Sequence, residues 1–340
     1  MKIVVIGAGA VGGVIAAYLS RDKYDVELVC KHKKTVEAIL NNGLRVQGLK
    51  GDVIAYPLAV LDVSQISERP DIVFLATKAH DVEEVTRALI PYLHEDTMVV
   101  PLQNGICEDK VADIVGRSRT VGCVVEWGST LTGPGRMEVT SEGRFIIGEL
   151  NNANTHRLIL LKSVLDRIFP VVVTDNIYGA LYSKLIVNSC ITTLGAITGL
   201  NLGDMLKMAE ARDVFLKTFS EAVSVTRAAG IRLEKIGNRL NPYDIELNHD
   251  EMKSKFSLSL LKKNIIIMLI GLKYRKLKSS SLQSLERGRA TEVDSLNGHI
   301  VDMAKQLHVP VPMNLRLISM VKDIENDKRK SDPDNLFQIV

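Results

Sequence analysis

The order of apolar and polar positions changes character about halfway along the chain. Up to residue 175, short β-branched runs alternate with stretches of helical periodicity, the pattern of βαβ units that build a parallel sheet. From residue 176 onward, long segments with a helical period replace the strands. The pattern predicts an α/β protein with a doubly wound sheet at 1–175, an all-helical domain at 176–325 and a frayed tail at 326–340.

The individual elements follow from the same pattern. Strands are expected at 2–6, 25–30, 71–75, 97–100, 120–126, 144–148 and 171–174, a hairpin at 43–55 and a turn at 133–135. Helices are expected at 176–200, 209–229, 255–272 and 291–307. The most apolar run, 264–272, falls well short of the ~20 residues needed to span a bilayer, so we expect a core helix there.

Composition narrows the class of protein and its partners. At 340 residues the chain exceeds the usual size of one core, so two domains of roughly 150 residues each are expected. The net charge of +3, from 43 basic and 40 acidic residues, provides no broad field for nucleic acid or an anionic membrane. We expect neither as a partner.

The cysteines and the N-terminus indicate a compartment. Cys30, Cys107, Cys123 and Cys190 lie far apart and form no C-x-x-C pair, which suits reduced structural thiols better than disulfides or metal ligands. The chain runs directly into a strand pattern at Lys2, leaving no room for a signal peptide. The expectation is a cytoplasmic protein without a metal.

A glycine-rich stretch, KIVVIGAGAVGG, joins the first predicted strand to an Ala/Val-rich helix. In this context Gly7 suits a tight turn, Gly9 the close approach of a pyrophosphate, and Gly12 the packing of helix on strand. The pyrophosphate would lie at the N-terminus of the helix, where backbone N–H groups point outward. The N-terminal domain is therefore predicted to be a Rossmann domain that binds a dinucleotide.

The end of the second predicted strand favours one cofactor over the other. About 20 residues beyond the glycines, NAD-binding chains offer an Asp or Glu to the ribose hydroxyls. This chain instead has Cys30, followed by Lys31, Lys33 and Lys34. Ammonium groups suit a 2′-phosphate, and no carboxylate is expected there to repel it. NADP(H) is favoured over NAD(H), with Lys31 as the binding lysine and the other two interpreted as a solvated helix start.

The stretch YSKLIVNSC, residues 182–190, places a lysine inside an otherwise apolar helix. Four-residue spacing advances a helix by about 400°, so Lys184, Asn188 and Thr192 are expected to form one slowly drifting stripe. Such a stripe of ammonium, amide and hydroxyl is typical of a helix that lines a cleft.

Four stretches together resemble the ketopantoate reductase family, in the family's order and over nearly the whole chain. They are LATKAHDV (75–82), PLQNGI (101–106), LYSKLIVNSCITTLGAITG (181–199) and KLKSSSLQSLERGRATEVDSLNGHIV (276–301). The resemblance implies NADPH-dependent reduction of 2-dehydropantoate to (R)-pantoate in a cleft between a Rossmann domain and a helical domain. It also implies a small 2-keto acid as partner and allows a homodimer.

The same resemblance implies roles for individual residues. Lys184 is implied as the general acid, and Glu292 as the catalytic residue that orients substrate and lysine. The implied substrate-binding residues are Asn188, Thr192, Ser280 and Asn104. The implied cofactor-binding residues are Gly7, Gly9, Ala10, Val11, Gly12, Lys31, Lys78, Asn104 and Glu292.

The chemistry of a keto-acid reduction is compatible with these roles. Hydride transfer creates an alkoxide whose charge must be neutralised as it appears. A lysine in a partly apolar helix loses some preference for its charged form, whereas a nearby carboxylate restores it, so the sequence leaves the direction of the pKa shift of Lys184 open. We expect Glu292, Ser295 and His299 on one side of a helix that begins near Thr291, with His299 as a bystander. The apolar residues expected to pack away from that side are Val293, Leu296 and Ile300.

The chain departs from the family pattern at several positions. Thr192 and Thr193 stand where an Asn-Pro pair is frequent, and a hydroxyl offers fewer bonds than an amide. Ser281, Ser284 and Trp127 also differ from the residues that are usual there. These departures affect expected lining residues and leave the identity of the 2-keto acid open.

Three alternatives remain open at this point. One is a reductase of another branched 2-keto acid. A second is a hydroxyacid or opine dehydrogenase, although no His-Asp pair near Asn188 supports the opine branch. A third is a regulator that binds NADPH without turnover, which would have no need for Lys184, Asn104 and Glu292 together.

Overall fold

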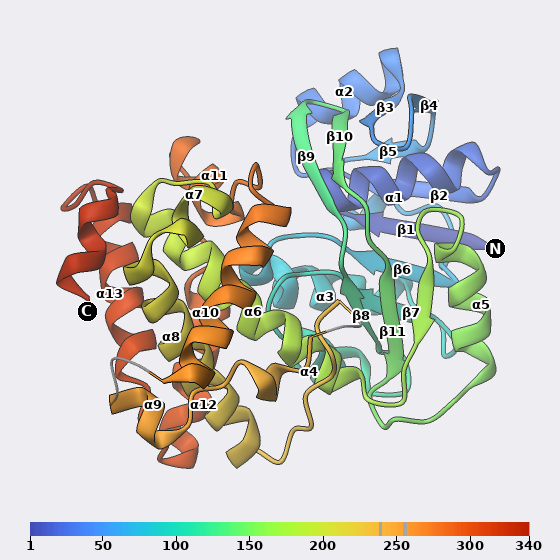
Figure 1. Ribbon diagram of the computed structural model, residues 1–340. Coiled ribbons are helices and arrows are strands. Elements are labelled where there is room, and N and C mark those ends of the chain that lie inside the picture. Colours follow the sequence, from blue (N-terminus) through green and yellow to red (C-terminus); the bar gives the residue numbers. More distant parts are fainter. Residues whose placement is uncertain (238–239, 254–256, 340) are drawn as a thin grey trace. The chain divides into compact units, whose positions relative to one another are not determined.

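The computed structural model of the protein describes residues 1–237, 240–253 and 257–339. It separates into an N-terminal unit, Met1–Tyr178, and a C-terminal unit, Gly179–Val340 (Figure 1). Parts of two expected elements, the helix at 255–272 and the tail at 326–340, lie outside the described residues at 255–256 and 340. The predicted fold class, a Rossmann-type parallel sheet followed by helices, is confirmed.

The main sheet of the N-terminal unit has five parallel strands in the order β5-β2-β1-β6-β7. These strands are β1 (Lys2–Ile6), β2 (Asp25–Val29), β5 (Leu58–Val60), β6 (Ile72–Leu75) and β7 (Met98–Pro101). The chain moves outward from β1 to β2 on one side and later returns to β6 on the other. In open parallel sheets, ligands bind outside the carboxyl ends of the strands at such a reversal.

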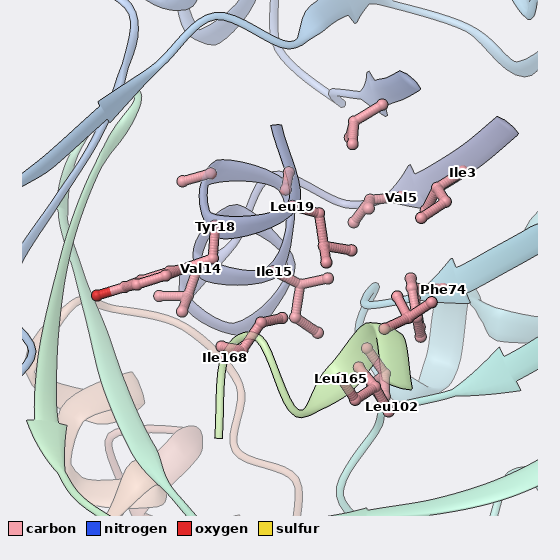
Figure 2. Close-up of a cluster of buried hydrophobic side chains, with 14 of the residues drawn as sticks. Ile3, Val5, Val14, Ile15, Tyr18, Leu19, Phe74, Leu102, Leu165 and Ile168 are labelled. Atoms are coloured by element: carbon pink, nitrogen blue, oxygen red, sulfur yellow. The ribbon is translucent and has the colours of Figure 1, made fainter. Parts of the chain in front are cut away.

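Alternation along β1 divides the apolar residues between two faces of this sheet. Ile3 and Val5 pack under α1 (Ala10–Arg21) and α5 (His156–Leu165). Figure 2 shows them in one cluster with the α1 side chains of Val14, Ile15 and Leu19. Val4 and Ile6 face α3 (Val82–Leu89) and α4 (Glu108–Val115) on the other side. A strand buried on both faces explains the continuous apolar run from Ile3 to Ile6.

The later strands of the N-terminal unit differ from the expected parallel arrangement. A four-stranded sheet, in the order β4-β3-β10-β9, contains β3 (Leu44–Gly48), β4 (Val53–Ala55), β9 (Gly128–Gly133) and β10 (Arg136–Ser141). A three-stranded sheet contains β8 (Val121–Val125), β11 (Phe145–Glu149) and β12 (Val171–Val173), and β11 runs antiparallel to β8. The remaining helix of this unit is α2 (Lys33–Asn42). Periodicity located β8, β11, β12 and the β3–β4 hairpin, but β9, β10 and the short β5 of the main sheet were not among the expected strands. It also could not show which strands pair.

The C-terminal unit is built of helices around α6 (Ile177–Thr198), which begins just before the unit boundary (Figure 1). Around it lie α7 (Leu202–Lys207), α8 (Ala209–Ala228), α9 (His249–Lys253), α10 (Leu258–Lys273), α11 (Ser280–Glu286), α12 (His299–Leu307) and α13 (Pro312–Glu325). A π-helical turn, Asp294–Gly298, leads directly into α12. The predicted helix at 291–307 therefore begins later and starts as a π-turn.

Helix α10 is not the core helix that its apolar sequence predicted. Its buried residues are Lys263, Ile267 and Gly271, spaced four apart, and Gly271 lies against α7, where an added Cβ would approach Leu206 Cβ to 2.8 Å. The exposed apolar side chains are Leu258, Leu261, Ile265, Leu269 and Leu272. Helix α10 is apolar on its exposed face as well as on its buried face. Composition alone therefore could not distinguish a core helix from a surface helix.

The described end of the chain, 326–339, is packed rather than frayed, which corrects the expectation of a frayed tail. Ser331 donates to the carbonyl of Ala196, and Asn335 Nδ2 donates to that of Ile197. Leu336, within the 3-10 helix Pro333–Gln338, is completely buried. These contacts satisfy carbonyls in the last turn of α6 that no later helical N–H can reach.

Within the described residues, α6 is the one helix with the length and apolar composition to cross a membrane. However, 78% of its most apolar window is buried inside the protein, as in the core helix of a helical domain. All four cysteines are buried and form no disulfide.

Candidate functional site

The glycine loop after β1 has the geometry that a dinucleotide site needs. Gly7 has a φ of +108°, and a Cβ there would lie 2.8 Å from the carbonyl oxygen of Ala76. A Cβ at Gly12 would lie 2.0 Å from the carbonyl oxygen of Gly7, so only glycine allows α1 to pack this closely. A Cβ at Gly9, the N-cap of α1, would meet no atom within 4 Å. Two glycines are thus required by packing, and the third borders open space at a helix N-terminus, which fits a pyrophosphate.

The loops after β6 and β7 reach the same edge of the sheet. Ala76 follows β6 and touches Gly7, and Lys78 lies two residues further along. The side-chain amide of Gln103, after β7, donates to Thr77 Oγ1 at 3.3 Å and so joins the two loops. Asn104 and Gly105 follow at once, with Gly105 at a φ of +95°. The structure therefore brings the glycine loop, the Lys78 loop and the Asn104 turn together.

Lys31 lies beside a carboxylate, contrary to the expectation of carboxylate-free surroundings. Its ammonium is 3.4 Å from Asp81 Oδ2, which belongs to the loop after β6. Because β2 and β6 flank β1, this ion pair joins the two neighbours of the strand that ends in the glycine loop. Burial raises the pKa of the Cys30 thiol to about 12, so the strand-end residue itself stays neutral.

The first turn of α2 carries lysines where the helix dipole favours anions. Lys33 and Lys34 occupy this turn and are exposed; Lys33 lies 3.7 Å from Glu37 one turn later. An anion at this position would offset the unfavourable placement of the ammonium groups. The basic cluster is thus suited to a phosphate, with Asp81 as an acidic neighbour that sequence spacing did not reveal.

Glu108 is a second acidic residue that the sequence analysis missed. It is buried directly after the Asn104 turn, and its carboxylate accepts a hydrogen bond from the backbone N–H of Cys107 at 3.0 Å. Burial raises the pKa of Glu108 to about 7, against the opposing effect of backbone hydrogen bonds from Glu108, Cys107 and Cys123. The carboxyl group therefore ties the loop after β7 to β8 and titrates close to neutral pH.

Helix α6 of the C-terminal unit presents one face that is not fully buried. Between Gly179 and Thr198, its half-buried positions are Lys184, Val187, Asn188 and Ile191. Thr192 does not share this face: it is buried, and its hydroxyl donates to the carbonyl of Asn188 at 2.7 Å. Thr192 is eight residues after Lys184, so its side chain points about 80° away from that of Lys184 around the helix axis. This rotation places Thr192 on the packed side of α6.

Ser280 lies at the first position of α11, whose N-terminus is fixed to α6. The preceding residue, Ser279, caps α11 by accepting from the N–H of Leu282 at 3.2 Å and donates to the carbonyl of Thr192 at 3.3 Å. A Cβ at Gly195 would lie 2.4 Å from Ser279 Oγ, so this glycine allows the contact. Ser280, half-buried, is thereby held beside the helix that carries Lys184 and Asn188.

Glu292 is half-buried on the bend before the π-turn, outside the helix on which it was expected. Its carbonyl accepts from the N–H groups of Ser295 and Leu296 at 3.0 and 3.1 Å. Val293, Leu296 and Ile300 are buried as predicted. The hydrophobic side of this segment was thus read correctly, but its helical geometry was not.

Two residues singled out by the sequence have structural partners. His299 Nε2 lies 3.1 Å from the hydroxyl of Tyr182, two residues before Lys184, which joins the start of α12 to α6. Trp127 is buried against Phe145 and Phe169, with ring centroids 5.6 and 4.9 Å away. Trp127 therefore belongs to the core of the N-terminal unit and does not line a site there.

Each unit thus carries its own group of polar side chains. The N-terminal unit offers a helix N-terminus, a basic cluster and an amide at the carboxyl edge of a Rossmann-type sheet. The C-terminal unit offers an ammonium and an amide on one face of α6, with Ser280 and Glu292 on elements bonded to that helix or to its neighbours. The group in the N-terminal unit has the chemistry to bind a dinucleotide, and the ammonium in the C-terminal unit has the chemistry to supply a proton.

Comparisons with known proteins agree with this description. The family described as "Ketopantoate reductase PanE/ApbA" matches residues 3–152, and its "C terminal" counterpart matches residues 176–325. The chain is 27% identical over 328 residues to a 2-dehydropantoate 2-reductase of Pyrococcus horikoshii, covering 96% of this chain and 98% of that relative.

Solved structures show the same fold. A PanE/ApbA family ketopantoate reductase from Ralstonia eutropha is similar with a TM-score of 0.81 at 28% identity, covering 96% of this chain and 99% of that one. A D-mandelate dehydrogenase in complex with NADH and anilino(oxo)acetate has a TM-score of 0.82 at 24% identity, with 96% and 99% covered.

The glycine geometry predicts that Gly9→Ala and Gly12→Ala fail in different ways. Gly9→Ala meets no protein atom, so we expect its melting temperature to stay close to wild type while dinucleotide affinity falls at least about tenfold. Gly12→Ala should lower the melting temperature because its Cβ overlaps Gly7. Thermal unfolding and cofactor titration measure both; equal loss of stability in the two variants would contradict the assignment.

The raised pKa of Glu108 predicts a pH-dependent stability of the N-terminal unit. Because the folded pKa of about 7 exceeds the ordinary value of 4.5, the favourable contribution is complete below pH 4.5 and is lost as pH rises through 7. The loss amounts to about 3 kcal/mol. Glu108→Gln should remove this part of the pH dependence in denaturant titrations, and an unchanged slope between pH 4.5 and 7 would show that Glu108 does not cause it.

Proposed function

Since the chain belongs to the ketopantoate reductase family of nicotinamide-dependent oxidoreductases, we propose that it reduces 2-dehydropantoate to (R)-pantoate with NADPH. Residues 1–175 would bind the cofactor and residues 176–325 would bind substrate and complete the reaction. The observation that carries this proposal is the half-buried face of α6, where Lys184 and Asn188 stand on an otherwise packed helix.

The cofactor-binding role falls to residues at the carboxyl edge of the main sheet. The N–H groups at the start of α1, from Ala10 and Val11, would hold the pyrophosphate next to Gly9. Lys78 and Asn104 lie on the loops after β6 and β7, which a side-chain hydrogen bond joins. With the pyrophosphate at the start of α1, both residues would be near the nicotinamide half of the dinucleotide. When bound, the reduced nicotinamide supplies the hydride.

Lys184 would donate the proton that completes the reduction. Negative charge develops on the keto oxygen of the substrate, and an ammonium aimed at that oxygen stabilises the charge and then transfers a proton to it. Lys184 is half-buried, so its ammonium acts where water screens charge less than at the surface. Leu185 and Ile186, which follow Lys184, are buried and fix the orientation of this turn of α6.

The remaining polar groups would bind the substrate. Asn188, one turn after Lys184, can donate to an oxygen of the keto acid, and Ser280 at the start of α11 can donate to its carboxylate. Glu292 would orient Lys184 and the substrate hydroxyl, and its backbone is already fixed by the π-turn. Thr192 has its hydroxyl proton committed to the carbonyl of Asn188, so only its oxygen remains as an acceptor.

A reductase of another branched 2-keto acid is the second candidate. It is favoured by the burial of Thr192, because a hydroxyl turned into the packing replaces an amide that is frequent at this position in the family. The proposed chemistry of Lys184 is the same for both substrates. A panel of 2-keto acids distinguishes them.

NADPH rather than NADH is proposed as the preferred cofactor. The support is the basic cluster of Lys31, Lys33 and Lys34, together with the absence of an acidic residue in the first turn of α2. Asp81 reduces the preference because it competes with a 2′-phosphate for Lys31.

A homodimer and a cytoplasmic location stay predictions. The exposed apolar side chains of α10 would be removed from water by a second copy of the chain, which supports self-association. The buried reduced cysteines suit a reducing compartment.

Lys184→Ala is expected to lower kcat at least about a hundredfold with 2-dehydropantoate, because the proton donor is lost, while the Kd for NADPH stays unchanged. Loss of NADPH absorbance across a panel of 2-keto acids provides the measurement. Lys207→Ala, at an exposed lysine paired with Asp204 on α7, is the control and should behave as wild type. Normal turnover of Lys184→Ala would remove the proposed acid, and NADPH binding without oxidation of any keto acid would favour a sensor.

Lys31→Glu is expected to weaken NADPH by about tenfold or more and NADH much less, because the removed charge faces the 2′-phosphate. Asp81→Asn should have the opposite effect and tighten NADPH selectively, since it frees Lys31 from its carboxylate partner. Titration of both variants with both cofactors tests this. Equal changes for NADPH and NADH would show that neither side chain reads the 2′-phosphate.

A further inference from the structure

A chain of buried side chains links α6 to the segment that carries Glu292. Thr193 Oγ1, on α6, donates to Asn297 Oδ1 at 2.6 Å. Asn297 Nδ2 in turn donates to the carbonyl of Ser189 at 3.1 Å and to Asn314 Oδ1 at 3.0 Å. Thr193, Asn297 and Asn314 are at most 1% exposed. The amide of Asn297 is thus held by α6 at two points and by α13 at a third.

The far end of this chain is anchored as firmly. The carboxylate of Glu221, on α8, accepts from the backbone N–H groups of Met313 and Asn314 at 2.7 and 2.9 Å and from Asn314 Nδ2 at 2.7 Å. These N–H groups belong to the first turn of α13, where a carboxylate is favoured. Asn314 therefore has a fixed orientation, and its oxygen is an immobile acceptor for Asn297.

Asn297 lies inside the π-turn, and its side chain bonds this turn to α6 and α13. The turn is closed by the N–H of Gly298, which donates to the carbonyl of Val293 at 3.0 Å. A π-turn contains one residue more than an α-turn, so it depends on tertiary contacts for its stability. The three hydrogen bonds of the Asn297 side chain are such contacts, and two of them reach α6.

The other side of Glu292 is held independently. The N–H and hydroxyl of Thr291 both donate to Glu325 Oε1 at 2.7 Å. Glu292 thus stands between Thr291, tied to α13, and Asn297, tied to α6. Any change in the Thr193 hydrogen bond would be transmitted to Glu292 through a short, otherwise fixed segment.

We propose that Thr193 and Asn297 are positioning residues, which set the place of Glu292 relative to the face of α6 that carries Lys184. The assignment of Glu292 to substrate and lysine rests on the proposed function. The hydroxyl of Thr193 holds the Asn297 amide by donating to its Oδ1. Without this hydroxyl, the buried Oδ1 of Asn297 would lose this donor, which is unfavourable in a dry environment. Thr193, a departure from the family pattern, thereby gains a role in this chain.

The test compares two isosteric substitutions on the same helix. Thr193→Val removes the donor to Asn297, whereas Thr198→Val removes a hydroxyl that donates to the carbonyl of Leu194 and accepts from the N–H of Leu200. Both threonines are 1% exposed, so the substitutions match in burial and volume. Each variant is characterised by melting temperature, Kd for NADPH, kcat and the pH profile of kcat/KM with 2-dehydropantoate.

Thr193→Val is expected to lower kcat on the order of ten- to a hundredfold, because a displacement of Glu292 by a fraction of an ångström disturbs the proton donor. Its pH profile should shift, and Thr193→Ser, which keeps the hydroxyl, should restore most of kcat. Thr198→Val should retain the kcat and pH profile of wild type.

The opposite results would overturn the proposal: wild-type kcat and pH profile for Thr193→Val, or an equal loss for Thr198→Val. Should Thr193→Val not fold, Thr193→Cys provides a milder test, because a thiol is a weaker donor. Glu292→Gln separates the two levels of inference. If it retains wild-type kcat, the proposed role of Glu292 fails; if it loses kcat while Thr193→Val does not, only the positioning role fails.

Discussion

The burial of α6 is the constraint on which the C-terminal unit depends. Almost every side chain of this 22-residue helix is packed, so little water reaches the backbone carbonyls of the helix. Side chains of neighbouring segments donate to these carbonyls instead. The donor and acceptor pairs are Asn297 to Ser189, Ser279 to Thr192, Ser331 to Ala196 and Asn335 to Ile197. The π-turn, the start of α11 and the C-terminal segment are therefore docked on one helix by directional bonds.

This arrangement leaves one face of α6 with partial exposure, and the face carries Lys184 and Asn188. A charged group is costly in a packed helix unless it has a partner or a task. The buried polar network on the packed side of α6, from Thr193 to Glu221, is fully hydrogen-bonded along its length, which makes it rigid rather than merely polar. A network of this kind holds α6, and with it the proposed proton donor Lys184, in a fixed orientation.

In the N-terminal unit the corresponding constraint is the close approach of backbones at Gly7 and Gly12. These glycines let α1 and the loop after β6 meet at the end of β1. The loops after β2 and β7 join the same edge through the Lys31–Asp81 pair and the Gln103–Thr77 hydrogen bond. Gly7 and Gln103, 96 positions apart in sequence, thus lie at one edge because parallel strands end there together.

The sequence alone determined the positions of most strands and of the long helices, the glycine loop and the lysine in an apolar helix, because these follow from local periodicity and from the chemistry of single residues. The short strand β5 and the pair β9 and β10 were not found in this way. Only tertiary structure decided that β11 and β8 pair antiparallel, that α10 is exposed, that Thr192 turns inward and that Glu292 precedes a π-turn. Each of these depends on which surface meets which, and contacts between segments distant in sequence leave no periodic signal. Asp81 beside Lys31 and Asn297 beside Thr193 are such contacts, 50 and 104 residues apart.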